Sequence, residues 1–243
     1  MVQINNDVAI IICGHGSRNT NYKASLVKLT NELKVRFKSK NFFYCFIEID
    51  SPLIEECLNS LIKDYKRIYF FPLFIFDGKH YKIDINHTLS KYRNYRKIVL
   101  IEKISLLKDI LPIFSRILKD QLEKGKEYFL ITSCSPSNDE EVKKQLLRYT
   151  KLLSQNLGLS YYDQHFVGQE SSSVSKVEKI IPPNSYVILH PIFFFDGFLS
   201  KKNVLFFEKI FKKNILILKP LVFYKKVKDA IEIKLLRNFE VFE

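Results

Sequence analysis

The sequence predicts an α/β protein made of two similar halves, each a four-stranded parallel sheet flanked by helices, related by internal duplication. Two observations carry this prediction. Continuous apolar runs alternate with segments of helical periodicity, which is typical of strands buried on both faces of a parallel sheet. The order of these segments then restarts after Lys126, so residues 1–124 and 125–243 are predicted as the two domains.

The first half alternates strands and helices from its start. The predicted strands lie at 8–13, 42–49, 68–76 and 97–104. Helices are expected at 20–38, after Ser51-Pro52, after the third strand and at 105–124. Ser51 is the expected N-cap of the second helix and Pro52 its first residue, with Glu55 and Glu56 placed early, where the helix dipole favours acids.

The second half repeats this order. Its predicted strands are YFLITSC, YYDQHFVG, YVILHPIFFF and NILIL, which begin at residues 128, 161, 186 and 214. Helices are expected from about 138, between the second and third strands, after the third strand and from about 222.

Sliding one half over the other separates scaffold from chemistry. An offset of 120 residues places Leu26 on Leu146, and an offset of 119 places Pro72 on Pro191. Three groups that can take a proton or bind a metal are lost at the same offsets: His15 falls opposite Ser135, Glu48 opposite Gly168 and His80 opposite Leu199. Features kept in both halves indicate fold, whereas the three lost groups are candidates for function.

His15, Glu48 and His80 come at or after the ends of the first three predicted strands. They therefore belong at the carboxyl edge of one parallel sheet, where open α/β folds bind ligands. Two imidazoles and a carboxylate suit a divalent ion such as Fe²⁺, Co²⁺, Ni²⁺ or Zn²⁺, and each group could also act as a base. The remaining histidines are expected to be structural or solvated: His87 on the surface, His165 and His190 inside apolar strands.

The turn GHGSR, residues 14–18, has features of a ligand loop. Gly14 and Gly16 allow tight backbone geometry, while Ser17 and Arg18 can hydrogen-bond a carboxylate or a phosphate. The turn lacks the glycines of a dinucleotide fingerprint and the Gly-Lys-Ser/Thr of a P-loop. A phosphate-binding loop remains an alternative at this point.

Composition narrows the classes of partner. The net charge of +13 favours anionic ligands, although enrichment in Lys, Ile, Asn and Phe is also what an AT-rich genome produces. Basic residues are spread along the helices, so no nucleic-acid partner is expected. The four cysteines are expected as buried reduced thiols. The N-terminus has no basic leader and no apolar span of membrane length, which predicts a complete cytoplasmic protein with no membrane association.

Three motifs carry a resemblance to a known family: GHGSR after the first strand, FIE before Ser51-Pro52, and PLFIFDGKHYKIDI at the third strand. With these motifs the chain resembles the sirohydrochlorin chelatases, class II chelatases that insert Co²⁺ or Fe²⁺ into sirohydrochlorin. Longer members are tandem fusions of two chelatase-like halves, so the resemblance covers most of the chain. It implies that His15 and His80 contact metal and accept protons and that Glu48 is the active-site carboxylate and a further metal contact. The second half is then a supporting lid.

The resemblance also implies the reaction partners. The substrate would be a tetrapyrrole with many carboxylates together with the divalent metal, no organic cofactor is expected, and the chain would act as a monomer or homodimer. Insertion of iron would lead toward siroheme and insertion of cobalt toward cobalamin. The predicted substrate contacts are Gly14, Gly16, Ser17, Arg18, Gly78, Lys79 and Phe198. Two alternatives stay open: a tetrapyrrole or metal carrier without turnover, and a phosphate-binding α/β protein.

Overall fold

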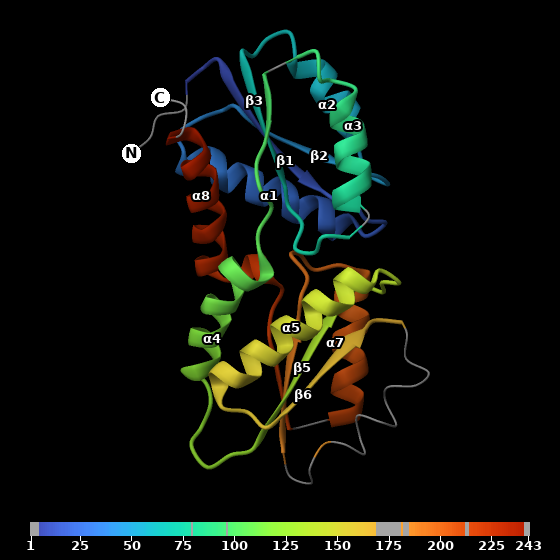
Figure 1. Cartoon of the computed structure of the whole chain (residues 1–243), viewed down its shortest axis with the longest axis vertical. Coiled ribbons are helices and arrows are strands. Elements are labelled where there is room, and N and C mark those ends of the chain that lie inside the picture. The colour runs from blue at the N-terminus through green and yellow to red at the C-terminus, as the bar shows by residue number, and fades with distance from the viewer. Residues whose placement is uncertain are drawn as a thin grey trace. The chain divides into compact units, whose positions relative to one another are not determined.

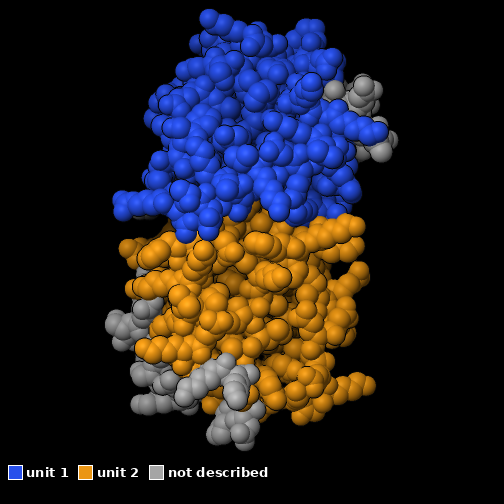
Figure 2. Space-filling view, turned by 180° about the vertical axis from the view of Figure 1, so that it is seen from behind, with its two compact units in different colours: residues 1–104, 228–243 blue, residues 105–227 orange. Residues whose placement is uncertain are grey.

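Two all-parallel sheets of four strands form the scaffold, with the orders β2-β1-β3-β4 and β6-β5-β7-β8 (Figure 1). The computed structural model describes residues 5–78, 80–95, 97–168, 181, 185–211 and 214–240. The chain divides into unit 1, residues 1–104 with 228–243, and unit 2, residues 105–227 (Figure 2). The predicted α/β class with two similar sheets is confirmed.

Unit 1 contains the first sheet and the helices that cover it. The strands are β1 (Val8–Gly14), β2 (Phe42–Phe46), β3 (Arg67–Pro72) and β4 (Ile98–Leu100). The helices are α1 (Thr20–Arg36), α2 (Ile54–Leu61), a π-helical segment (His80–Ile85) that continues into α3 (Asn86–Ser90), and α8 (Lys225–Glu240). Helix α1 begins where the Asn19 side chain accepts the Asn21 N–H, and it buries Leu26, Leu29 and Leu33 along one face.

Unit 2 repeats this arrangement. Its strands are β5 (Tyr128–Cys134), β6 (Tyr161–Phe166), β7 (Tyr186–Pro191) and β8 (Ile215–Ile217). Its helical segments are a π-helical turn (Leu106–Ile110), α4 (Leu111–Lys119), α5 (Glu140–Leu157), α7 (Phe198–Phe211) and a 3₁₀ turn (Leu221–Phe223). Helix α5 is capped by Asp139 and stops at Gly158, which adopts a left-handed conformation with φ 68°.

The strand registers reproduce both offsets found in the sequence. Cys13 lies opposite Cys45 and Pro72 in unit 1, and Ser133 lies opposite His165 and Pro191 in unit 2. The two sheets are therefore equivalent residue by residue, as expected of duplicated half-domains. Equivalent positions in the two units can be compared directly.

One helix of each half belongs to the unit built mainly from the other half. Helix α4 follows β4 in the chain, yet its Phe114 packs 4.1 Å from the His190 ring of unit 2. Helix α8 ends the chain, yet its Phe239 packs against Phe37 and Tyr69 of unit 1, at 6.0 and 5.0 Å between ring centroids. The boundary between the two units thus differs from the predicted boundary at 124/125, because α4 and α8 each bury their apolar face on the sheet of the other half.

Several predicted element ends differ from the structure. Strands β2, β3 and β4 stop at Phe46, Pro72 and Leu100 instead of 49, 76 and 104. Helix α2 begins at Ile54, not at Pro52, because the Phe46 N–H donates to the Pro52 carbonyl at 2.9 Å and keeps this segment beside β2. The Glu56 carboxylate then caps the helix by accepting the Leu53 N–H at 2.7 Å. The helix expected between 169 and 185 falls largely outside the described residues.

The expectations for cysteine are confirmed. Cys13, Cys45, Cys57 and Cys134 are all buried free thiols. Burial raises the pKa of Cys45 well above its ordinary value, with the neighbouring Cys13 and Cys57 thiols acting in the same direction. Within the described part of the chain, no helix has the length and apolar character needed to cross a bilayer.

Candidate functional site at the carboxyl edge of the first sheet

Three loops meet at the carboxyl edge of the unit 1 sheet because β1 lies between β2 and β3. Backbone hydrogen bonds continue past the strand ends and hold the loops together. The Glu48 N–H donates to the His15 carbonyl at 3.1 Å, and the Leu73 N–H donates to the Cys13 carbonyl at 2.8 Å. The predicted convergence of these loops is what the structure contains.

His15 and Glu48 form the centre of this edge. His15 Nδ1 lies 3.6 Å from Glu48 Oε1 and 3.2 Å from the Gly16 carbonyl oxygen. Because both neighbours are acceptors, the geometry favours the tautomer with hydrogen on Nδ1, which leaves the lone pair on Nε2. The side chains are 35% and 48% exposed, so the pair can exchange protons with solvent or substrate.

The glycines of the GHGSR turn serve close backbone packing. A Cβ on Gly16 would lie 1.8 Å from the Glu48 carbonyl oxygen, and Gly16 has φ +100°. A Cβ on Gly14 would lie 3.0 Å from Leu26 Cδ2 and 3.2 Å from the Tyr22 hydroxyl. Gly16 therefore allows the His15 and Glu48 loops to touch, and Gly14 allows the end of β1 to lie against α1, while their role as substrate contacts stays a prediction.

The first turn of α1 offers little to a phosphate. The Ser17 N–H donates to the Asp50 carboxylate at 2.9 Å, and the Asn19 N–H donates to the Ser17 hydroxyl at 3.1 Å. The Asn21 N–H is taken by the Asn19 side chain. These amides already have acceptors, and the negative charge of Asp50 would repel an anion, so the phosphate-loop alternative is disfavoured. Arg18 is exposed to solvent.

Two residues that support His15 were not predicted. The His15 N–H donates to the Tyr22 hydroxyl at 3.0 Å, and burial raises the pKa of Tyr22 to about 12, which keeps it a neutral phenol. Asp50 links the second loop to the first through Ser17. The available signals were weak: a tyrosine in the first turn of a helix, and an acid two residues after Glu48.

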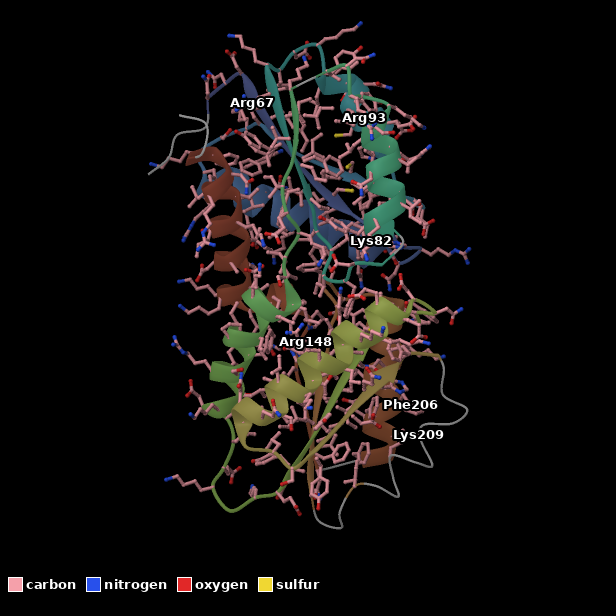
Figure 3. The ribbon with its side chains drawn as sticks, viewed as in Figure 1. Arg67, Lys82, Arg93, Arg148, Phe206 and Lys209 are labelled. Carbon is pink, nitrogen blue, oxygen red and sulfur yellow. The ribbon has the colours of Figure 1, made fainter. Side chains whose placement is uncertain are left out.

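The third loop follows β3 at this edge and leads to His80. The Phe74 ring lies 6.3 Å from the His15 ring, and the Gly78 carbonyl accepts the N–H groups of Tyr81 and Lys82, each at 3.1 Å. This turn starts the π-helical segment at His80; Figure 3 labels Lys82 within it. The His80 side chain and all of Lys79 lie outside the described part, so their roles stay predictions. No cluster of three or more metal-binding side chains occurs among the described residues.

The equivalent edge of unit 2 has the same backbone without the chemistry. The Val167 N–H donates to the Cys134 carbonyl at 3.0 Å, as the Ile47 N–H does to Gly14. Ser135, Gly168 and Leu199 stand where unit 1 has His15, Glu48 and His80. Phe198 begins α7 and is 68% exposed, and its role as a substrate contact stays a prediction.

The other histidines are accounted for by the fold. His87 is exposed, whereas His165 and His190 are buried, as predicted. His190 Nε2 lies 2.8 Å from the Tyr149 hydroxyl, and burial lowers the pKa of His190 to about 3. His165 stacks on Phe206, with ring centroids 5.5 Å apart.

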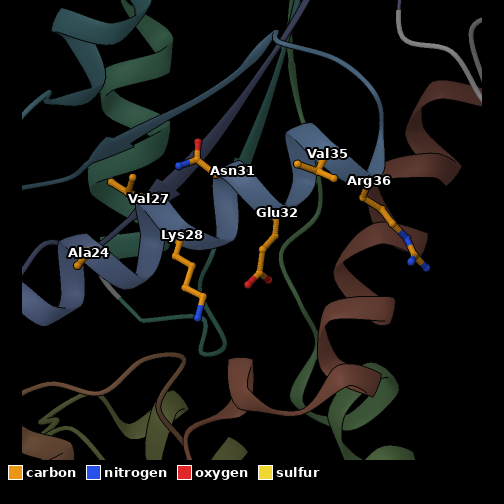
Figure 4. A pocket seen from close by; sticks show the side chains of 7 residues that line it. All are labelled: Ala24, Val27, Lys28, Asn31, Glu32, Val35 and Arg36. Carbon is orange, nitrogen blue, oxygen red and sulfur yellow. The ribbon is translucent and has the colours of Figure 1, made fainter.

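Basic side chains are distributed over many elements. Figure 3 labels Arg67 on β3, Arg93 after α3, Arg148 on α5 and Lys209 on α7. A surface hollow in unit 1 is lined by residues of α1 alone, including Lys28 and Glu32 (Figure 4). None of the predicted site residues lines this hollow, so the chemistry is assigned to the sheet edge.

Comparison with known proteins shows what the chain is similar to. The CbiX family model matches residues 9–120, which contain His15, Glu48 and His80. A curated sirohydrochlorin ferrochelatase from Priestia megaterium is 24% identical over 203 residues, which cover 81% of this chain and 76% of the relative.

Solved structures show the same fold. The SirB structure from Bacillus subtilis with Fe³⁺ has a TM-score of 0.77 and 19% identity, covering 94% of each chain. The sirohydrochlorin chelatase SirB from Bacillus subtilis subspecies spizizenii, in complex with cobalt, has a TM-score of 0.71 and 19% identity over 94% of this chain and 93% of that one.

The two-sheet fold and the histidine–carboxylate edge together define a chelatase-like α/β protein. The family match and the curated relative support a narrower assignment. Residues 9–120 match the CbiX family, and the chain is similar over most of its length to a sirohydrochlorin ferrochelatase.

Proposed function

We propose that this protein inserts a divalent metal ion, Co²⁺ or Fe²⁺, into sirohydrochlorin. The observation that carries the proposal is the pair of His15 Nδ1 and Glu48 Oε1, 3.6 Å apart at the carboxyl edge of a chelatase-like sheet. The curated ferrochelatase relative and the two SirB structures, with Fe³⁺ and with cobalt, support the substrate and the kind of ion.

The proposed chemistry follows from the tautomer of His15. Insertion replaces two pyrrole protons with one divalent ion, so the site has to bind the ion and remove two protons. With Nδ1–H held toward Gly16 and Glu48, His15 Nε2 presents a lone pair that can bind the ion or accept a pyrrole proton. Glu48 orients the imidazole, can contact the ion itself, and passes protons to solvent from its half-exposed position. His80 is proposed as the second imidazole.

Substrate binding is proposed to use positive charge near these groups. Arg18 is exposed three residues after His15, and Lys79 precedes His80 in the sequence. Both suit the carboxylates of the tetrapyrrole. Ser17, Gly78 and Phe198 complete the proposed contacts, while Gly14 and Gly16 shape the loop. Both ions fit one set of imidazole and carboxylate donors, so iron toward siroheme and cobalt toward cobalamin remain the two forms of the proposal.

The test is an anaerobic absorbance time course of sirohydrochlorin with Co²⁺ or Fe²⁺, with and without the protein. The proposal expects conversion to the metallated spectrum at a rate that depends on protein concentration, and the ratio of kcat/KM for the two ions would identify the pathway. A shifted spectrum without turnover would replace the proposal with a carrier. No spectral response would overturn it.

A further inference from the structure

The segment that carries His80 is held from both sides by one buried lysine. Lys103, which follows β4, is 7% exposed, and its ammonium donates to the Ile75 carbonyl at 2.6 Å. It also lies 3.2 Å from Asp77 Oδ1 and 5.6 Å from the centre of the Tyr81 ring. Ile75 and Asp77 precede His80 and Tyr81 follows it, so one group contacts the turn before and after the predicted histidine.

These contacts satisfy the N–H donors of the Lys103 ammonium. A lysine has three N–H donors, and here a carbonyl, a carboxylate and an aromatic face surround it. Burial lowers the pKa of Lys103, while the Asp77 carboxylate acts in the opposite direction. Burying a charge costs free energy unless the charge is paired, so a lysine buried at this place is expected to have a specific role.

The second unit shows that the sheet does not need this lysine. Strand pairing places Ile98 opposite Ile68 and Ile215 opposite Val187, and the Ile101 N–H bond to Phe70 is repeated by Leu218 to Leu189. When the residues after these pairs are counted in each unit, Pro220 stands at the position equivalent to Lys103. Asp196 keeps the place of Asp77 but interacts with the Ser200 hydroxyl at 3.5 Å. The lysine is thus absent from the unit in which Leu199 replaces His80.

We infer that Lys103 is a positioning residue for His80, because it holds Ile75 and Asp77 before the histidine and Tyr81 after it. The expected effect on catalysis rests on the proposed function, whereas the expected effect on the structure rests only on the contacts of Lys103. Removal of groups that orient metal-binding side chains typically costs about 10–100-fold in activity. Lys103→Met is expected to lower kcat by a factor in that range, with KM for sirohydrochlorin changed less.

The experiment compares four proteins: wild type, Lys103→Met, Lys103→Arg and Lys97→Met. Lys97 is the matched control, because it precedes β4 and its ammonium donates to the carbonyls of Ile62 and Tyr65, not to the 75–81 segment. Hydrogen exchange of the Tyr81 and Lys82 amides, which bond to Gly78, reports the order of the turn, and steady-state insertion kinetics report its use.

Lys103→Met is expected to speed exchange of these two amides about tenfold or more, while exchange in β1 stays at the wild-type rate. Lys103→Arg, which keeps the charge, should show a smaller increase. Lys97→Met should show none. Exchange and kcat at wild-type values in Lys103→Met would overturn the inference. If Lys103→Met fails to fold, Asp77→Asn, which removes the carboxylate beside the Lys103 ammonium, takes its place, and wild-type exchange and kcat in that variant would overturn the inference. If the wild type inserts no metal, the proposed function fails, whereas exchange still decides whether Lys103 holds the turn.

Discussion

The chemistry of His15 follows from what lies beside Nδ1. The Gly16 carbonyl lies within hydrogen-bond distance of Nδ1 and the Glu48 carboxylate lies 3.6 Å from it, so the favoured tautomer has Nε2 as its basic atom. A functional role for His15 and Glu48 could be predicted from the sequence because the second half lacks a histidine and a carboxylate at the equivalent positions. The supporting contacts of Tyr22 and Asp50 could not, since a buried phenol and a loop carboxylate have no spacing that distinguishes them from structural residues.

Glu48→Gln should lower kcat for metal insertion by about 10–100-fold, because the amide fills the same space beside His15 but cannot take a proton or carry charge. Glu55→Gln is the matched control, since Glu55 is 49% exposed like Glu48 but pairs with Lys91 on another surface. Steady-state rates of both variants against wild type make the comparison. Equal rates for all three proteins would assign Glu48 to structure.

His190 should make stability depend on pH. Burial lowers its pKa to about 3 in the folded state from an ordinary value of 6.5, so below pH 6.5 the unfolded chain binds a proton that the folded chain refuses. The contribution of His190 to the free energy of unfolding should be constant above pH 6.5. It should fall as the pH drops toward 3, and the loss should be about 2 kcal/mol at pH 5.

Urea unfolding at pH 7 and pH 5 measures this loss in wild type and in His190→Gln. The variant is expected to lose less stability between the two pH values, whereas His87→Gln, at an exposed position, should behave as wild type. An identical pH dependence in all three proteins would mean that the folded and unfolded chains bind a proton at His190 equally well, which would contradict a lowered pKa.

At the scale of elements, the strands were predictable and their ends were not. Buried apolar runs predicted the central strands of both sheets, because a parallel sheet covered on both faces needs apolar residues on both, whereas the outer strand β6 carries Asp163 and Gln164. The runs continue past the strand ends, since loop residues such as Leu73, Ile75 and Ile101 are also buried. Apolar content therefore does not mark where β3 or β4 stops, and the hydrogen bonds between loops decide it.

Gly16→Ala should separate the first two loops. The added methyl would lie 1.8 Å from the Glu48 carbonyl oxygen at φ +100°, so either His15 or Glu48 must move, and the insertion rate should fall at least about tenfold. Gly125→Ala is the control, because Gly125 has φ +81° and no atom within 4 Å of an added Cβ. A similar loss of activity in both variants would contradict the account, since backbone strain is common to both and the clash is not.

At the scale of the whole molecule, the exchange of α4 and α8 between the halves could not be predicted. An apolar helix face indicates that the helix must cover a sheet, but not which sheet, and the two sheets are alike. The ion pairs of α8 are with unit 1: Lys228 with Glu32 at 2.6 Å, and Arg36 with Glu232 at 2.9 Å. Unit 1, which carries the candidate site, is therefore completed by the last segment of the chain.

Leu235→Ala tests this completion, because Leu235 is fully buried on α8. The loss of a buried leucine side chain is expected to lower the free energy of unfolding by about 2–5 kcal/mol, and hydrogen exchange in β3 of unit 1 should rise. Ile233→Ala, at a position that is 47% exposed on the same helix, should cost less than about 1 kcal/mol. Equal effects of the two variants would show that α8 does not contribute to the core of unit 1.

The most direct test of the central claim, that the chemistry belongs to the edge carrying His15, is the initial rate of Co²⁺ or Fe²⁺ insertion into sirohydrochlorin by His15→Gln beside wild type. Circular dichroism should first establish that the variant is folded. The account predicts a rate lower by about 100-fold or more, because the amide supplies no basic nitrogen for the ion or the pyrrole proton. A folded variant that inserts metal at the wild-type rate would contradict the account.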